Sequence, residues 1–191
     1  MNIILFGPPG AGKGTQGDNI VQHFNLHKVS SGDLLRNEIK KSTKIGLKIK
    51  SIIDDGHLVS DEIINNLIEN ILKEKKFYNR LIFDGYPRNL EQAKKLSLLL
   101  EKYKQNISVV FSLNVSKEKV IKRILGRQTC TKCGLIFNEY FNPSTRDTHK
   151  CGSDFLMKRS DDNEGTIIKR FETYLEKTLP LLNYYKDQNL L

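Results

Sequence analysis

Several residue types and patterns are scarce in this sequence, and each scarcity excludes a class of protein. The 191 residues include no tryptophan and only three cysteines, a set too small and odd in number for a disulfide framework. No apolar run approaches the roughly 20 residues that cross a bilayer. The first residues have neither a basic leader nor a long apolar stretch, so we expect no signal peptide, no membrane partner and a cytoplasmic location.

Acidic residues are also in the minority. Lysine and arginine total 31 against 22 aspartates and glutamates, which gives a formal net charge of +9. This balance leaves two classes open, a nucleic-acid-binding protein and an enzyme for anionic substrates. Only eight of the basic residues are arginines, while 23 are lysines spread along the chain. Because arginine is the better bidentate phosphate ligand, the positions of the arginines are the more informative.

The order of apolar runs and periodic segments predicts an α/β fold. The predicted strands are residues 2–6, a short run ending at 28–29, 80–84 and 108–114. The predicted helices are a stretch from after Thr15 to about residue 24, a helix capped by Ser31, one capped by Ser60, and residues 91–103, 117–125 and 164–175. Such alternation predicts an open parallel sheet with helices on both faces. Ligands of these sheets bind beyond the carboxyl ends of the strands.

Residues 7–13 match the phosphate-binding loop, because Gly7 is followed after four residues by Gly12-Lys13. Glycines let backbone N–H groups converge on phosphate oxygens, and the lysine and the following helix N-terminus add positive charge. The usual motif has serine or threonine directly after the lysine, whereas here Gly14 precedes Thr15. The residues expected to bind the phosphates are Gly10, Ala11, Gly12, Lys13, Gly14 and Thr15.

Four motifs, in order, resemble those of the adenylate kinase family, in its long-lid, zinc-binding type. They are Gly7-Pro8-Pro9-Gly10-Ala11-Gly12-Lys13-Gly14-Thr15, Ser31-Gly32-Asp33-Leu34-Leu35-Arg36, Asp84-Gly85-Tyr86-Pro87-Arg88 with Gln92, and Lys158-Arg159-Ser160-Asp161-Asp162-Asn163 with Arg170. The resemblance covers essentially the whole chain and implies a P-loop nucleoside monophosphate kinase fold.

The resemblance also implies a division of the chain. The core P-loop domain would comprise residues 1–29, 60–125 and 163–191. Two inserted mobile lobes would be a monophosphate-binding lobe at 30–59 and a zinc-stapled lid at 126–162. Long-lid relatives continue past Leu191, so the strand at 108–114 is expected at an exposed edge of the sheet.

The implied activity is reversible phosphoryl transfer from Mg-ATP to AMP, giving two ADP and balancing the adenine nucleotides. Bringing several phosphates together requires positioned cations, and six of the eight arginines lie in or beside the motifs. The implied catalytic residues are Lys13, Arg88, Arg123, Arg127, Arg159 and Arg170. Asp33 and Asp84 would orient water molecules on Mg²⁺; the alternatives are a helix N-terminal charge for Asp33 and a strand-end cap for Asp84.

By the same resemblance, ATP would contact the phosphate loop, Arg127, Ile136 and Phe137. The residues implied for AMP are Ser31, Arg36, His57, Leu58, Val59, Gly85, Tyr86, Pro87, Arg88, Gln92, Arg159 and Arg170. Gln92 would hydrogen-bond the adenine, because an amide donates and accepts in one plane. The alternatives are an exposed helical glutamine at position 92 and packing of Ile136 and Phe137 inside the lid.

The three cysteines form the pattern Cys130-x2-Cys133-x17-Cys151-x2-Asp154. Two knuckles of this spacing suit a tetrahedral, structural Zn²⁺. The family includes lids with three cysteines and one aspartate, so the implied ligands are Cys130, Cys133, Cys151 and Asp154. His149 is the rival fourth ligand, and a lid without metal is the third possibility.

Other functions compete with this one. A GTP:AMP kinase or a pyrimidine nucleoside monophosphate kinase would share the same motifs. A zinc-ribbon nucleic-acid-binding protein would suit the basic isoelectric point of about 9.4. That class, however, leaves the phosphate loop unexplained, and the chain lacks a basic stripe interleaved with aromatic residues. We therefore expect a monomer that binds ATP, AMP and ADP and no nucleic acid.

Overall fold

A four-stranded parallel sheet forms the centre of the computed structural model, which describes residues 1–191. The strands are β1 (Ile3–Phe6), β2 (His27–Ser30), β3 (Leu81–Asp84) and β4 (Val109–Ser112), in the order β2-β3-β1-β4. The predicted open parallel sheet is thus confirmed, and β1, β3 and β4 are shorter than their predicted runs.

Eight α-helices surround this sheet. They are α1 (Lys13–Phe24), α2 (Ser31–Lys40), α3 (Lys44–Asp54), α4 (Asp61–Leu72), α5 (Leu90–Lys102), α6 (Lys117–Leu125), α7 (Glu164–Thr173) and α8 (Leu181–Lys186). Short helical turns are η1 (Lys75–Phe77), η2 (Ser153–Phe155) and the π-helix η3 (Tyr174–Thr178). None of the helices has the length and apolar character that a membrane span requires.

The start of α2 differs from the sequence prediction by one residue. Ser30, and not Ser31, is the N-cap, and its hydroxyl oxygen accepts a hydrogen bond from the Asp33 backbone N–H at 3.3 Å. Ser31 begins the helix, and its Oγ donates to the Gly85 carbonyl oxygen at 2.6 Å. Ser30 therefore caps the helix, and Ser31 joins the helix to the turn after β3.

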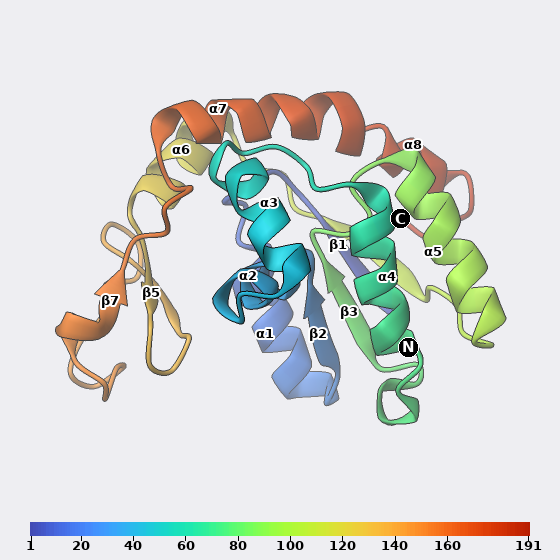
Figure 1. Cartoon of the computed structure of the whole chain (residues 1–191), viewed down its shortest axis with the longest axis horizontal. Helices are drawn as coiled ribbons and strands as arrows, with labels where there is room; N and C mark the ends of the chain where they lie inside the picture. The colour runs from blue at the N-terminus through green and yellow to red at the C-terminus, as the bar shows by residue number, and fades with distance from the viewer.

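Alternation along β1 explains why helices cover both faces of the sheet. Ile4 and Phe6 belong to the main core, which includes buried residues of α4, α5 and α8. Ile3 and Leu5 belong to a second cluster that packs against α1. Figure 1 shows the resulting layers, with α7 running along the top of the molecule toward α8.

The fourth strand lies at an edge of the sheet, as predicted. Phe111 of β4 is 46% exposed there. The C-terminal segment reaches this edge, because the Val110 N–H donates to the Leu190 carbonyl oxygen at 2.8 Å.

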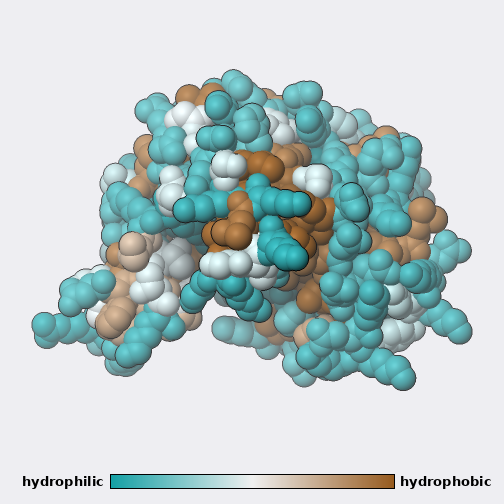
Figure 2. All heavy atoms as spheres, viewed as in Figure 1, coloured by the Kyte–Doolittle hydropathy of each residue, from teal (hydrophilic) through white to brown (hydrophobic).

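A second, antiparallel sheet lies within residues 126–162, the segment expected to form the lid. Its strands are β5 (Arg127–Cys130), β6 (Ile136–Asn138) and β7 (Leu156–Met157), in the order β6-β5-β7. Figure 1 shows this lobe set apart from the body on the left. The segment 30–59, expected to form the other lobe, contains α2 and α3. In Figure 2, hydrophobic residues reach the surface over α3, where Leu47 is 71% exposed.

At Gly46, α3 lies close against the backbone of α2. A Cβ atom built on Gly46 would lie 2.1 Å from the Glu38 carbonyl oxygen. Thr43 caps α3 beside it, since its side-chain oxygen accepts a hydrogen bond from the Gly46 N–H at 3.0 Å. The absence of a side chain at position 46 therefore permits this helix pair.

We predict that Gly46→Ala lowers the free energy of unfolding by about 1–3 kcal/mol, because the added methyl group forces backbone atoms apart. Gly165→Ala is the matched control, since the nearest atom to its Cβ would lie at an ordinary 3.7 Å. That control should be neutral or stabilising by up to ~1 kcal/mol. Thermal unfolding followed by circular dichroism measures both, and equal melting temperatures for the two variants would contradict the prediction.

Candidate active site

A cleft of about 490 Å³ opens at the carboxyl ends of the strands, a volume typical of small-molecule sites. Its walls come from the loop after β1, the start of α2, the segment before α4, the turn after β3, the lid and α7. All residues that the sequence analysis assigned to catalysis, ATP, AMP or magnesium line this cleft, except Tyr86.

Tyr86 lies beneath the cleft. It is 1% exposed and belongs to the main core. Its hydroxyl donates to Asn65 Oδ1 at 2.6 Å. Burial, with a smaller effect of the nearby Asp61 charge, raises the pKa of this phenol well above its usual value. The prediction that Tyr86 contacts AMP therefore differs from the structure, in which the ring supports the turn from below.

The loop between β1 and α1 has the conformation that its glycines permit. Gly7, Gly10 and Gly12 all have positive φ, and Cβ atoms on Gly7 and Gly10 would come within 2.8 Å of neighbouring atoms. The Lys13 ammonium donates to the carbonyl oxygens of Gly7 at 2.7 Å and Pro8 at 2.9 Å. Burial lowers the pKa of Lys13 to about 8, and nearby arginines contribute to this shift.

Asp84 lies beside the same loop, at the end of β3. A Cβ atom on Gly14 would lie 3.7 Å from the Asp84 Oδ2, so the carboxylate adjoins the first turn of α1. Asp33, by contrast, is exposed and pairs with Arg36 of its own helix at 2.6 Å. This contact favours the helix-end interpretation of Asp33, while the role of Asp84 toward magnesium stays a prediction.

Six arginines converge on the cleft from different elements. They are Arg36, Arg88, Arg123, Arg127, Arg159 and Arg170, whereas Arg80 and Arg146 lie outside it. Arg88 donates from Nε to the Gly85 carbonyl oxygen at 2.7 Å, and Arg123 donates to the Ala11 carbonyl oxygen at 3.1 Å. These neutral acceptors orient the guanidinium groups and leave their charge available for an anion.

Two carboxylates that the sequence analysis left without a role hold two of these arginines. Asp162 accepts from Arg127 Nε at 2.8 Å and also pairs with its terminal nitrogen. Asp161 pairs with Arg170. Burial opposes ionisation of Asp161, but the Arg170 charge and hydrogen bond outweigh it, so the pKa of this carboxyl is lowered.

The remaining arginines make the cleft strongly positive. Burial lowers the pKa of Arg88 to about 10, and the neighbouring Arg170 adds to the effect. Burial lowers the pKa of Arg159 to about 10 as well, with repulsion from Arg127 and Arg36. Burial and, to a smaller extent, the neighbouring arginine charges both disfavour an uncompensated cation, so a bound anion would stabilise these groups.

The π-helix η3 brings a further residue to the site. Thr178 is buried at its end and donates from Oγ1 to the Arg88 carbonyl oxygen at 2.8 Å, although the two residues are 90 positions apart. Single π-helical turns often occur at functional sites. The sequence carries no local signal for this contact.

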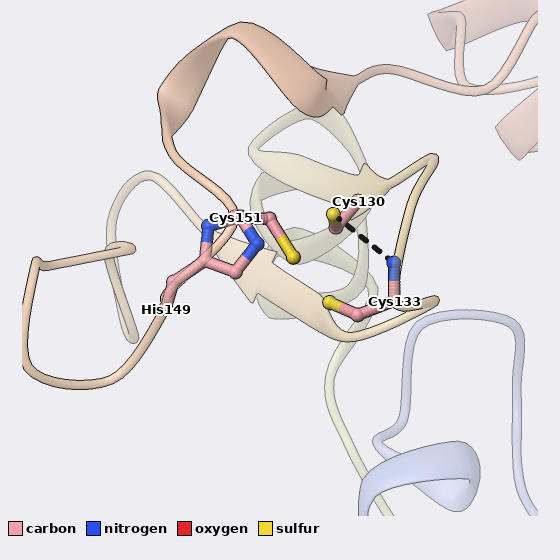
Figure 3. A group of neighbouring side chains, drawn as sticks. All are labelled: Cys130, Cys133, His149 and Cys151. Atoms are coloured by element: carbon pink, nitrogen blue, oxygen red, sulfur yellow. Dashed lines mark hydrogen bonds between the residues drawn. The ribbon is translucent and has the colours of Figure 1, made fainter.

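A separate cluster lies in the lid. The ligand atoms of Cys130, Cys133, His149 and Cys151 all lie within 4.8 Å of one another, and Figure 3 shows these side chains directed toward a common point. His149 is buried, its Nδ1 is 3.0 Å from the Ser144 hydroxyl, and its Nε2 has no hydrogen-bond partner. An orphaned, buried imidazole nitrogen beside three thiols fits a metal ligand.

The prediction that Asp154 is the fourth ligand is therefore wrong, and its rival His149 takes that place. Asp154 lies in the short helix η2 and is exposed. The antiparallel pairing of β5 with β7 holds η2 at the lobe surface, while the loop before Cys151 folds the histidine inward. Spacing along the chain could not distinguish these two arrangements.

The thiols themselves differ in acidity. Burial alone would raise the pKa of Cys130, but backbone N–H groups of Cys133 and Lys132 donate to its sulfur and lower the pKa to about 6. For Cys151, burial and hydrogen bonds with the other two cysteines raise the pKa to about 11. One thiol is thus prepared for ionisation, which metal binding requires.

Comparisons with known proteins agree with this geometry. A family model described as adenylate kinase matches residues 5–190. The adenylate kinase of Pelagibacter ubique (strain HTCC1062) is 50% identical over 99% of this chain and 89% of its own length. Those of Alkaliphilus oremlandii (strain OhILAs) and Rickettsia africae (strain ESF-5) are 42% and 45% identical, over 100% and 98% of this chain and 89% and 87% of their own lengths. The chain belongs to the adenylate kinase family of enzymes.

Proposed function

We propose that this protein transfers the terminal phosphoryl group of Mg-ATP to AMP, reversibly, giving two ADP. The observation that supports this most is the convergence of six arginines on the cleft that also contains the phosphate loop. A reaction between two nucleotides brings several negative phosphates together, and such a ring of cations opposes their repulsion.

On the donor side, the loop amides and Lys13 would hold the β- and γ-phosphates. Arg123 and Arg127 would stabilise charge on the transferring group, and Ile136, which is 37% exposed at the cleft, would contact the adenine. Phe137 also lines the cleft, but it is 5% exposed and packs on the His149 ring. Mg²⁺, when bound with ATP, would supply charge neutralisation beside Asp84.

On the acceptor side, Arg36 and Arg88 would hold the AMP phosphate, and Gln92 would meet the base. Arg159 and Arg170 would join the transferring group from the lid edge and α7. Closure of residues 30–59 and 126–162 over the core would exclude water, so that AMP rather than water receives the phosphoryl group. Ser160 already donates to Asp54 Oδ1 at 2.8 Å, a contact that joins the two lobes.

For the lid cluster, we propose a structural Zn²⁺ held by three thiolates and the Nε2 of His149. Cys130 and Phe137 are the buried apolar side chains of residues 127–162, so the lobe has almost no core of its own. A closed tetrahedral site would stabilise it instead. The monomeric state and the cytoplasmic location stay predictions from the sequence.

The activity is tested by an ADP-forming assay that pairs ATP or GTP with each nucleoside monophosphate, with and without Mg²⁺. We expect Mg²⁺-dependent turnover with ATP and AMP. Arg88→Ala should lower kcat/KM by about 10³-fold, because it removes a buried charge that faces the phosphates. Arg146→Ala, outside the cleft, should change it less than twofold. Preference for GTP or a pyrimidine monophosphate, or near-normal turnover of Arg88→Ala, would contradict the proposal.

The lowered pKa of Lys13 predicts a pH dependence for nucleotide binding. Below pH 8 the ammonium is charged and attracts phosphates, whereas above about pH 8 binding must first restore the proton. The Kd for ATP should therefore rise by up to about tenfold per pH unit above 8. Calorimetry at pH 7 to 9.5, in buffers of different ionisation enthalpy, measures Kd and proton uptake. Lys13→Arg stays charged and should remove this slope; the same slope in that variant would exclude Lys13 as its cause.

The lid site makes a prediction that separates its two candidate ligands. His149→Ala should lose most of its zinc and unfold the lid at a lower temperature, because the metal loses one of four ligands. Asp154→Ala should keep about one zinc per chain. Metal analysis of the purified variants, together with proteolysis of the lid, measures both. Equal zinc contents in the two variants, or a wild-type protein without metal, would overturn the assignment.

A further inference from the structure

The side-chain amide of Gln92 is held by groups whose hydrogen-bonding sense cannot change. Gln92 lines the cleft and is 3% exposed. Its Oε1 accepts from the Arg88 backbone N–H at 2.8 Å, and its Nε2 donates to Asp61 Oδ1 at 2.7 Å. A backbone N–H donates and an ionised carboxylate accepts, so these contacts permit one orientation of the amide.

Asp61 is itself anchored. It is the first residue of α4, and both of its carboxylate oxygens accept from Asn89 Nδ2 at 3.1 Å. Asn89 is also the N-cap of α5, where its Oδ1 accepts from the Gln92 N–H at 2.8 Å. Asp61 lies outside the cleft lining, so any effect on a bound ligand must act through Gln92.

The orientation matters because a primary amide can match two kinds of purine. After the two contacts described above, the Gln92 amide keeps one N–H and one oxygen lone pair. A 6-aminopurine presents a donor at its exocyclic nitrogen beside an acceptor at N1, and a 6-oxopurine presents the reverse order. A free amide matches either base by a half-turn of its last torsion, whereas the clamped amide would have to break two hydrogen bonds.

We propose that Asp61 is a positioning residue that fixes the Gln92 amide and thereby selects a 6-aminopurine monophosphate over a 6-oxopurine monophosphate. The inference rests on the proposed function, since it takes AMP as the nucleotide bound beside Gln92. It adds a source of base discrimination that lies behind the cleft wall. A merely structural role for Asp61, as a charge in the first turn of α4, would leave this discrimination unchanged.

The test uses Asp61→Asn in the full-length chain. Asparagine has nearly the same shape but can present either an N–H or an oxygen to Gln92. One of the two constraints on the amide is then removed, and only the Arg88 N–H still opposes its half-turn. We expect the ratio of the IMP inhibition constant to the AMP KM to fall by about tenfold, the effect of one hydrogen bond to a charged group. IMP is used as a competitive inhibitor against AMP, and the KM for ATP should stay within twofold of the wild-type value.

Glu62→Gln is the matched control, because Glu62 is the next residue, is exposed and also lies in the first turn of α4. It removes the same helix-end charge and should leave the ratio unchanged. Asn89→Ser keeps a good N-cap and removes one donor to Asp61. It should therefore shift the ratio in the same direction as Asp61→Asn, by a smaller factor. This second variant keeps the proposal testable if Asp61→Asn folds poorly.

The outcomes separate the two proposals. A wild-type protein that turns over ATP and AMP, with an unchanged ratio in Asp61→Asn or Asn89→Ser, overturns the role of Asp61 and leaves the proposed function intact. An equal shift in Glu62→Gln overturns it as well, because a helix charge would then suffice. A wild-type protein without AMP-dependent turnover overturns the proposed function itself.

Discussion

Repulsion between like charges around one cleft is the constraint on which the rest of this structure depends. Lys13 and six arginines face the same cavity. Burial together with mutual repulsion lowers the pKa of Lys13, Arg88 and Arg159. Such a concentration of buried cations is unfavourable until anions enter the cleft. The fold must therefore hold these side chains in place without cancelling their charge.

The contacts around the arginines meet this requirement in two ways. Asp161 and Asp162 form ion pairs with two arginines, which orders these guanidinium groups at the cost of part of their charge. Arg88 and Arg159 form no ion pair, and Arg88 is held by uncharged partners, among them Ser31 and the turn after β3. Thr178 fixes the Arg88 backbone from the far end of the chain. The arginine side chains are thus held in fixed positions while the cleft keeps a net positive charge.

Partners distant in the sequence also orient a polar side chain at the proposed base site and another in the lid. Gln92 is oriented by a carboxylate on another helix, so a neutral amide gains a direction that it lacks alone. In the lid, the His149 ring packs against Phe137 at 4.8 Å between centroids and directs its free nitrogen toward the cysteines. In both places a buried polar group takes its role from a partner distant in the sequence.

Local patterns in the sequence were enough to predict the parallel sheet, the bounds of α6 and the phosphate loop. These features depend on neighbouring residues and on the fact that parallel strands end at one edge. The family resemblance supplied the nucleotide and magnesium residues, all of which except Tyr86 line the cleft. Only the tertiary structure decided that Tyr86 lies under the cleft, that Ser30 caps α2 and that His149, not Asp154, joins the three cysteines of the lid. The contact of Gln92 with Asp61 crosses 31 residues and that of Thr178 with Arg88 crosses 90. Such contacts are set by how the helices pack, because burial requires each polar group to find a partner wherever the fold brings one.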